Sequence, residues 1–186
     1  MRCFVLDEAD EILSKGFEEQ IAAIFKALPY EGEMQSIVVS ATMPPEALDM
    51  TARFLRPDPI RILMKEEELS LAGIRQYYIH MDQESWKYEC LKDIYANVQT
   101  AKSIIFVNTR NSAELLAERL TADDFTVSCL HGDLPAKERR EIMKRFRTTA
   151  RVLVATDLLG RGIDVQQVGL VVNYELTRRG EAYVHR

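Results

Sequence analysis

The stretch Cys3-Phe4-Val5-Leu6-Asp7-Glu8-Ala9-Asp10 (CFVLDEAD) decides the fold, because a short apolar run changes there into a turn rich in carboxylates. The pattern returns at residues 152–157 (VLVATD), where four apolar residues precede Thr and Asp. Continuous apolar runs of this length indicate strands that are buried on both faces. Segments with helical spacing lie between the runs. The sequence therefore predicts an α/β fold, in which helices cover both faces of parallel sheets.

Outward from these two stretches, further apolar runs predict the other strands. Strands are expected at residues 3–6, 36–39, 60–63, 76–81, 103–107, 126–130, 152–155 and 170–173. Helical spacing predicts helices at residues 84–98 and 135–147, and another that contains Ile21 and Leu28. One more helix opens at Asn111, where Glu114 completes a capping box.

An acidic segment that ends in Ala-Gly, residues 66–73, predicts a linker. Residues 1–65 then belong to a first domain and residues 74–186 to a second. Residues 1–73 carry 7 basic and 14 acidic side chains, whereas residues 74–186 carry 17 basic and 15 acidic ones. This asymmetry indicates that the two domains have different electrostatic roles.

The composition is typical of a globular protein, with 47% hydrophobic and 28% charged residues among 186. No apolar run approaches the roughly 18 residues that a membrane-spanning helix needs. The first residues lack the apolar core and cleavage site of a secretory signal. Three scattered cysteines favour reduced thiols. We therefore expect a cytoplasmic protein, with the nucleus as the alternative.

Ligands of parallel sheets bind beyond the carboxyl ends of the strands, so the residues after each strand are the candidates for chemistry. Asp7 and Glu8 follow the first strand. One carboxylate there can hold Mg²⁺ on a nucleoside triphosphate, and the other can orient or deprotonate an attacking water. A solvated turn or helix cap is the alternative. Ser40 and Thr42 follow the next strand, and they can bond a neighbouring carboxylate or cap a helix.

Three polar loops follow strands of the second domain, at residues 108–110 (NTR), 131–133 (HGD) and 156–164. Glycine lets backbone amides approach a phosphate closely, and Thr and Arg add donors. Three such loops at one edge favour a shared binding edge. We interpret His131 by itself as a structural histidine at a strand end.

Basic side chains gather between residues 137 and 151. They are Lys137, Arg139, Arg140, Lys144, Arg145, Arg147 and Arg151. Such a face can follow a phosphate backbone. It can equally be the solvated face of a helix, and the pattern alone does not separate the two interpretations.

Taken together, the motifs resemble those of the DEAD-box ATP-dependent RNA helicases. Residues 5–11 (VLDEADE) resemble the motif that names the family, and residues 40–42 (SAT) resemble its third motif. The fourth, fifth and start of the sixth motif resemble residues 105–110, 155–164 and 183–186. The stretches between the motifs are most similar to the 4A type of eukaryotic translation initiation factor.

The resemblance implies two RecA-like lobes that close on ATP, Mg²⁺ and RNA, and residues 1–65 would be the C-terminal part of the first lobe. The implied catalytic residues are Asp7, Glu8, Asp10, Ser40, Thr42, His185 and Arg186. In this scheme Asp7 holds Mg²⁺ and Glu8 positions the attacking water. Asp10 bonds Ser40 and Thr42, and it bonds His185 once the lobes close.

The resemblance also implies binding residues in the second lobe. The implied contacts to ATP are Asp164, Arg161 and Gly162. The implied contacts to the RNA backbone are Thr109, Arg110, Gly132, Arg139 and Thr156.

The sequence departs from the family pattern in several places. The glycine-rich phosphate loop is not among these residues, and the sixth motif stops at Arg186, so we expect that this chain alone does not hydrolyse ATP. Ala136 stands where this subfamily has a glutamine, and Gly160 replaces an alanine. Leu176-Thr177 stands where a proline is expected.

The implied function is an ATP-dependent RNA helicase that unwinds short RNA duplexes in translation initiation. The alternatives are a truncated, non-enzymatic protein that binds RNA or a scaffold, a splicing or ribosome-assembly helicase, and a helicase-fold enzyme that acts on DNA. The expected partners are single-stranded or locally paired RNA, held by its backbone without sequence specificity, and a translation-initiation scaffold protein. We expect a monomer with no membrane partner.

Overall fold

The computed structural model describes residues 3–14, 16–28, 34–43, 45–63, 73–157, 165, 167–178 and 180–186. The chain forms two compact units, Met1–Leu69 and Ser70–Arg186. Within the described ranges, none of the helices is both long and apolar enough to cross a lipid bilayer.

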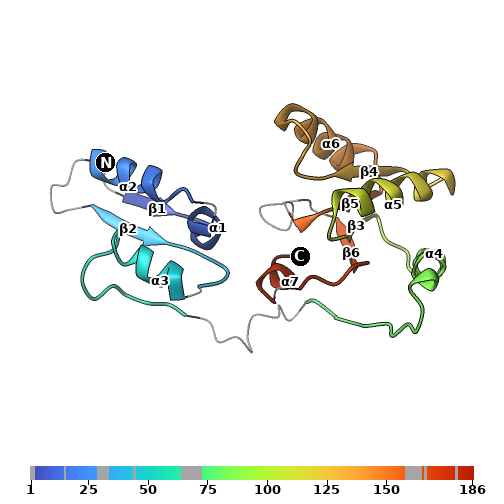
Figure 1. Cartoon of the computed structure of the whole chain (residues 1–186), viewed down its shortest axis with the longest axis horizontal. Coiled ribbons are helices and arrows are strands. Elements are labelled where there is room, and N and C mark those ends of the chain that lie inside the picture. The colour runs from blue at the N-terminus through green and yellow to red at the C-terminus, as the bar shows by residue number, and fades with distance from the viewer. Residues whose placement is uncertain are drawn as a thin grey trace. The chain divides into compact units, whose positions relative to one another are not determined.

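The first unit is built on two parallel strands, β1 (Cys3–Leu6) and β2 (Gln35–Val38), which pair from Cys3↔Gln35 to Leu6↔Val38. Around them lie α1 (Ala9–Ser14), α2 (Glu18–Ala27) and α3 (Pro45–Thr51), as Figure 1 shows.

Aromatic edge contacts connect these elements. The Phe25 ring lies 5.4 Å from the Phe4 ring and 5.3 Å from the Phe54 ring. The core remains small, because α2 buries none of its side chains and Val5 on β1 is 56% exposed.

The second unit contains a four-stranded parallel sheet in the order β4-β5-β3-β6. Its strands are β3 (Lys102–Phe106), β4 (Val127–Leu130), β5 (Val152–Ala155) and β6 (Val168–Asn173). Every residue of β3 and β5 is buried, as their apolar sequences predict.

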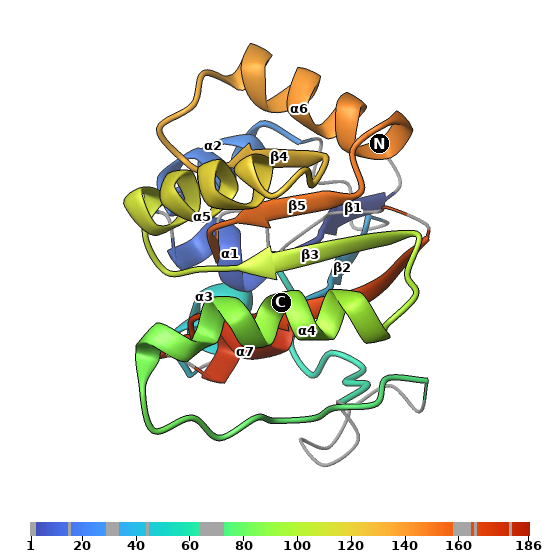
Figure 2. The same ribbon diagram turned by 90° about the vertical axis from the view of Figure 1, so that its right-hand side faces the viewer.

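Helices cover both faces of this sheet. A short 3₁₀ turn (Glu84–Trp86) leads into α4 (Lys87–Asn97), and the other helices are α5 (Arg110–Ala122), α6 (Ala136–Thr148) and α7 (Gly180–His185). Side chains of α4 and α5 pack with Ile105 and Val154, and both helices lie in front of the strands in Figure 2. Phe146 of α6 packs with Phe106 and Leu153, whose side chains point to the other face. The predicted α/β class with parallel sheets is confirmed.

Lys102 begins β3 and is 7% exposed. Its Nζ donates to the carbonyl oxygens of Phe146 and Ala150, at 2.5 and 3.0 Å, where α6 ends. A buried ammonium needs such acceptors because it has lost its water. The pair of bonds fastens the end of α6 to the sheet.

Two predicted strands are wrong. Residues 60–63 and 76–81 have no strand structure, and their apolar side chains face solvent, with Ile60 95% exposed and Tyr78 92% exposed. A strand needs a neighbour to bond its backbone, and neither segment pairs with a described strand. An apolar run indicates that a segment favours the strand conformation, but it does not show which strand, if any, pairs with that segment.

The predicted capping box at Asn111 is also wrong. The cap is Thr109, whose side chain accepts a hydrogen bond from the Ser112 amide at 3.0 Å, and α5 begins at Arg110. Thr109 keeps an extended backbone, which suits a cap residue. Glu114 instead turns towards His131.

Candidate functional site

The acidic turn after β1 has an unusual backbone. Glu8 has a φ of 51°, in the left-handed region that residues other than glycine rarely adopt. Its amide donates to Asp7 Oδ1 at 2.9 Å, and its carbonyl accepts from the amides of Glu11 and Ile12 at 3.0 and 3.1 Å. Asp7 is exposed and Glu8 is half-buried. The turn therefore begins α1 while it keeps both carboxylates at the strand end, a place where strain often accompanies function.

Asp10 connects this turn to the end of β2. Its amide donates to Ser40 Oγ at 3.2 Å, and Thr42 Oγ1 donates to Asp10 Oδ2. A backbone bond from the Ala9 amide to the Val39 carbonyl, 3.2 Å long, runs beside these contacts. Asp10 is only 5% exposed, so its carboxylate depends on such donors. The structure thus brings together Asp10, which follows the first strand, with Ser40 and Thr42, which follow the second.

In the second unit, the loops after β3, β4 and β5 reach one edge of the sheet because these strands are parallel. Thr109 caps α5 there, and its hydroxyl also lies 2.8 Å from Ser112 Oγ. Thr156 is 9% exposed, and its amide donates to the Leu130 carbonyl at 3.3 Å. Gly132 is half-buried in the loop after β4.

Ion pairs join the loop after β4 to α5. Arg110 Nη1 lies 2.8 Å from Asp133 Oδ2, and Arg110 Nε lies 3.6 Å from Glu114 Oε1. Glu114 Oε1 also lies 3.3 Å from Nε2 of the buried His131. The sequence pattern predicts a cap role for Glu114, and it does not predict these contacts with Arg110 and His131. Their only signal was the spacing of four residues between Arg110 and Glu114.

Arg186 joins the ends of β3, β5 and β6. Its side chain is 0% exposed, and Nε donates to Asp157 Oδ1 at 2.5 Å. Nη1 donates to Asn173 Oδ1 at 3.2 Å and to the Glu175 carbonyl at 2.7 Å, and Nη2 donates to Asn108 Oδ1 at 2.8 Å. The guanidinium is therefore occupied by this network. Asp157, Asn173 and Asn108 were missed as its partners, although each stands at or just past a strand end.

The basic face lies on α6, whose one buried residue is Phe146. Five of its basic side chains are exposed, and none of them forms an ion pair with another described residue. They are Lys137, Arg140, Lys144, Arg145 and Arg147. Arg139 is half-buried, and its Nε has no hydrogen-bond partner among the described residues. The five exposed cations are thus available to an anionic ligand.

Asp164, Arg161 and Gly162, the predicted contacts to ATP, lie outside the described residues. Among the residues that the structure does describe, no group of three or more His, Cys, Asp or Glu side chains is placed to hold a metal ion.

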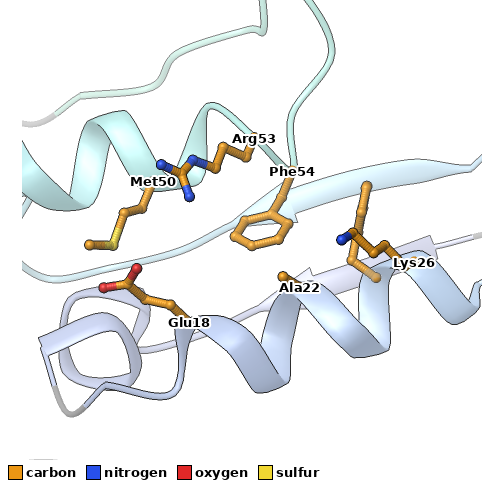
Figure 3. A pocket seen from close by; sticks show the side chains of 7 residues that line it. Glu18, Ala22, Lys26, Met50, Arg53 and Phe54 are labelled. Carbon is orange, nitrogen blue, oxygen red and sulfur yellow. The ribbon is translucent and has the colours of Figure 1, made fainter.

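A shallow groove of about 270 Å³ opens between α2 and α3 of the first unit. Figure 3 shows Phe54 reaching from the α3 side towards Ala22 on α2, with Glu18 and Lys26 near the groove's ends. It contains none of the predicted site residues.

Two families match the sequence. Residues 1–51 match the DEAD/DEAH box helicase family, and residues 86–186 match the helicase conserved C-terminal domain. Between them, the matches contain every motif quoted from the sequence.

Curated relatives match over the whole chain. The eukaryotic initiation factor 4A of Caenorhabditis elegans is 52% identical over 187 aligned residues, which cover 100% of this chain and 46% of that protein. The ATP-dependent RNA helicase eIF4A of Candida glabrata is 51% identical with the same coverage. The chain therefore spans about half the length of the curated relatives it matches.

Solved structures show the same fold. Dbp5 of S. cerevisiae, bound to RNA and ADP BeF3, matches 100% of this chain and 49% of its own at 32% identity, with a TM-score of 0.85. A DEAD box protein from Methanococcus jannaschii has the same identity and coverage and a TM-score of 0.58. These likenesses confirm the predicted RecA-like architecture.

Proposed function

Because the chain belongs to the DEAD/DEAH box helicase family, we propose that it is part of an ATP-dependent RNA helicase that unwinds RNA locally in translation initiation. Relatives named initiation factor 4A and ATP-dependent RNA helicase support this proposal. The observation that carries it is the contact of Asp10 with Ser40 and Thr42. That contact joins two strand-end motifs, so a movement of the acidic turn would also move the residues at the end of β2.

Asp7 fits a magnesium ion that is bound to a nucleotide. Mg²⁺ commonly takes only one or two protein carboxylates and completes its shell with phosphates and water. The Asp7 carboxylate is exposed, and the Glu8 amide orients it. When bound, the ion would neutralise charge on the phosphates.

We assign Glu8 to orient the attacking water in the same turn. Its backbone is fixed by the two amides that bond its carbonyl, so the carboxylate starts from a defined position. A preorganised base loses little freedom when the reaction occurs. Asp10 is already held by Thr42, and we give it the role of linking the two motifs rather than of a base.

The second unit supplies the RNA surface in this proposal. Thr109, Gly132 and Thr156 stand at one sheet edge, and Arg139 lies in the first turn of α6, among its basic side chains. Hydroxyls, backbone amides and cations bind phosphate and sugar without reading bases, which gives binding without sequence specificity. We further propose a cytoplasmic monomer that works with a translation-initiation scaffold protein.

The test is ATP hydrolysis by the full-length protein with and without single-stranded RNA, measured for the unaltered protein and for Glu8→Gln. We expect RNA to stimulate hydrolysis and Glu8→Gln to reduce it by roughly 100-fold or more, since a positioned base contributes about that factor. Glu19→Gln, at an exposed position on α2, is the matched control and should leave the rate unchanged.

The proposal fails if the unaltered protein binds RNA with an affinity that ATP does not change and shows no hydrolysis. That result would instead support a non-enzymatic RNA-binding protein. The intact mass of the native protein, measured at the same time, shows whether the natural product is longer than this chain of 21.3 kDa.

A further inference from the structure

The loop at residues 131–133 is tied to α5 on both sides of Gly132. On one side, His131 Nε2 lies 3.3 Å from Glu114 Oε1. On the other side, Arg110 Nη1 donates to Asp133 Oδ2 at 2.8 Å. The two ties meet, because Arg110 Nε lies 3.6 Å from the same Glu114 oxygen. Gly132 therefore sits between two residues whose side chains contact α5.

The two contacts differ in burial. The His131 side chain is 7% exposed, whereas Arg110 and Asp133 are 56% and 68% exposed. The loop thus has one buried contact with α5, through His131, and one solvent-exposed contact, through Asp133. Glu114 also helps to raise the pKa of the Cys129 thiol on β4, in addition to the larger effect of burial.

We propose that Arg110 and Glu114 are positioning residues for RNA binding, which hold the Gly132 backbone in place, and that Arg110 does not itself contact a phosphate. The inference rests on the proposed function, since it requires RNA to bind at this edge. It replaces the direct contact between Arg110 and RNA that the family resemblance implies. The reason is that two of the guanidinium nitrogens already face carboxylates.

The charges of Glu114 and Asp133 make the two explanations predict opposite effects on RNA affinity. Glu114 and Asp133 are acidic residues beside a surface that is proposed to bind a polyanion. As simple charges they would repel RNA, so neutralising either of them should strengthen binding. If they position the loop, neutralising them should weaken binding instead.

The first comparison is between Glu114→Gln and Glu118→Gln. Both variants have the same net charge, and Glu118 is an exposed residue one turn further along α5 that forms no ion pair with a described residue. We expect Glu114→Gln to weaken the Kd for a short, fluorescein-labelled oligouridylate, measured by fluorescence anisotropy. Relative to Glu118→Gln, the expected loss is roughly 2- to 5-fold, the range for ion pairs that are largely exposed.

The second comparison separates a positioning role from a phosphate contact. Asp133→Asn frees the Arg110 guanidinium from its closest partner. If Arg110 bound phosphate, the variant would bind RNA more tightly, whereas the inference expects weaker binding. In addition, Arg110→Gln should leave the slope of log Kd against log salt unchanged. Loss of a true phosphate contact would reduce that slope by about 0.7 for single-stranded RNA.

The outcomes keep the two proposals apart. If the unaltered full-length protein does not bind the RNA, the proposed function fails and the inference fails with it. If the full-length protein binds but Glu114→Gln matches Glu118→Gln, or Asp133→Asn tightens binding, the inference alone is overturned. Circular dichroism checks that each variant is folded. If Glu114→Gln does not fold, the exposed Arg110–Asp133 pair still decides the question.

Discussion

The reactivity of a single side chain in this protein depends on how deeply its strand is buried, as two cysteines show. Cys129 lies on β4, where burial raises the pKa of its thiol to about 11, and the nearby Glu114 carboxylate adds to the effect. Cys3, on β1, is exposed. Because the thiolate is the nucleophile, these two cysteines should differ strongly in reactivity.

We expect iodoacetamide at mildly alkaline pH to modify Cys3 well before Cys129 in the folded chain. Peptide mapping by mass spectrometry at successive times measures both rates. In denaturant the two rates should converge, which is the control for intrinsic reactivity. Equal rates in the folded chain would contradict the burial of Cys129.

The acidic turn shows how far single residues could be predicted. The strand-end rule pointed to Ser40 and Thr42 as partners of a neighbouring carboxylate, and the family resemblance implied that this carboxylate is Asp10. The structure joins Asp10 to Thr42. The rule could not predict the partners of Arg186, which come from the ends of three strands. Pairing across such distances depends on strand order, and a single sequence does not contain that order. The strain at Glu8 also leaves no mark in the sequence, because no glycine stands there.

At the scale of elements, one tyrosine joins α4 to α5. The Tyr88 hydroxyl lies 2.9 Å from Asp123 Oδ2 and 3.1 Å from the Arg119 carbonyl, and the Arg119 guanidinium stacks 3.6 Å from the ring centre. Burial raises the pKa of Tyr88 to about 12, and the hydrogen bond and charge of Asp123 contribute.

Tyr88→Phe should destabilise the second unit by about 1 kcal/mol near neutral pH, the usual net value of such a hydrogen bond. The folded pKa lies above the ordinary value of 10.0. The contribution of Tyr88 is therefore complete below about pH 10 and is lost as the pH rises through about 12. Urea unfolding at a series of alkaline pH values should show a shallower loss of stability for Tyr88→Phe than for the unaltered chain.

Tyr77→Phe is the matched control, because Tyr77 is 83% exposed in the same unit. It should leave both the stability and its pH dependence unchanged. An identical alkaline profile for Tyr88→Phe and the unaltered chain would show that Tyr88 does not couple proton binding to folding.

Strands that are covered on both faces were predicted well, whereas two segments that pair with no described strand were wrongly predicted to be strands. Residues 103–107 and 152–155 were identified within a residue of β3 and β5, because a short, continuously apolar run is typical of a strand that is covered on both faces. Residues 76–81 were also predicted to be a strand, although they include Gln76 and His80, and they carry the exposed Tyr78. The difference lies in whether a neighbouring strand is available, which is a property of the whole sheet.

At the scale of the whole molecule, the two units have unequal cores. In the first unit β1 and β2 have only each other among the described strands, and Val39 after β2 is 48% exposed. In the second unit, apolar clusters fill both faces of the sheet, with Leu153, Ile105 and Phe146 at 0% exposure. Stability rises with the apolar area that is buried, so the second unit should be the more stable.

Amide hydrogen exchange, followed by mass spectrometry of peptides, tests this difference. We expect peptides from β3 and β5 to exchange much more slowly than peptides from β1 and β2, because backbone amides are protected by the stability of the unit that contains them. Equal protection in the two units would refute the expectation.

The bonds of Lys102 have a consequence for chemical modification. Its amine lies beneath the end of α6, whereas Lys137 and Lys144 on the same helix are exposed. An acylating reagent or a modifying enzyme can therefore reach those two lysines in the folded protein, but it reaches Lys102 only when α6 separates from β3. Acylation of Lys137 and Lys144 on α6 can thus occur in the folded protein. Acylation of Lys102, which the same helix covers, would instead accumulate only through unfolding events.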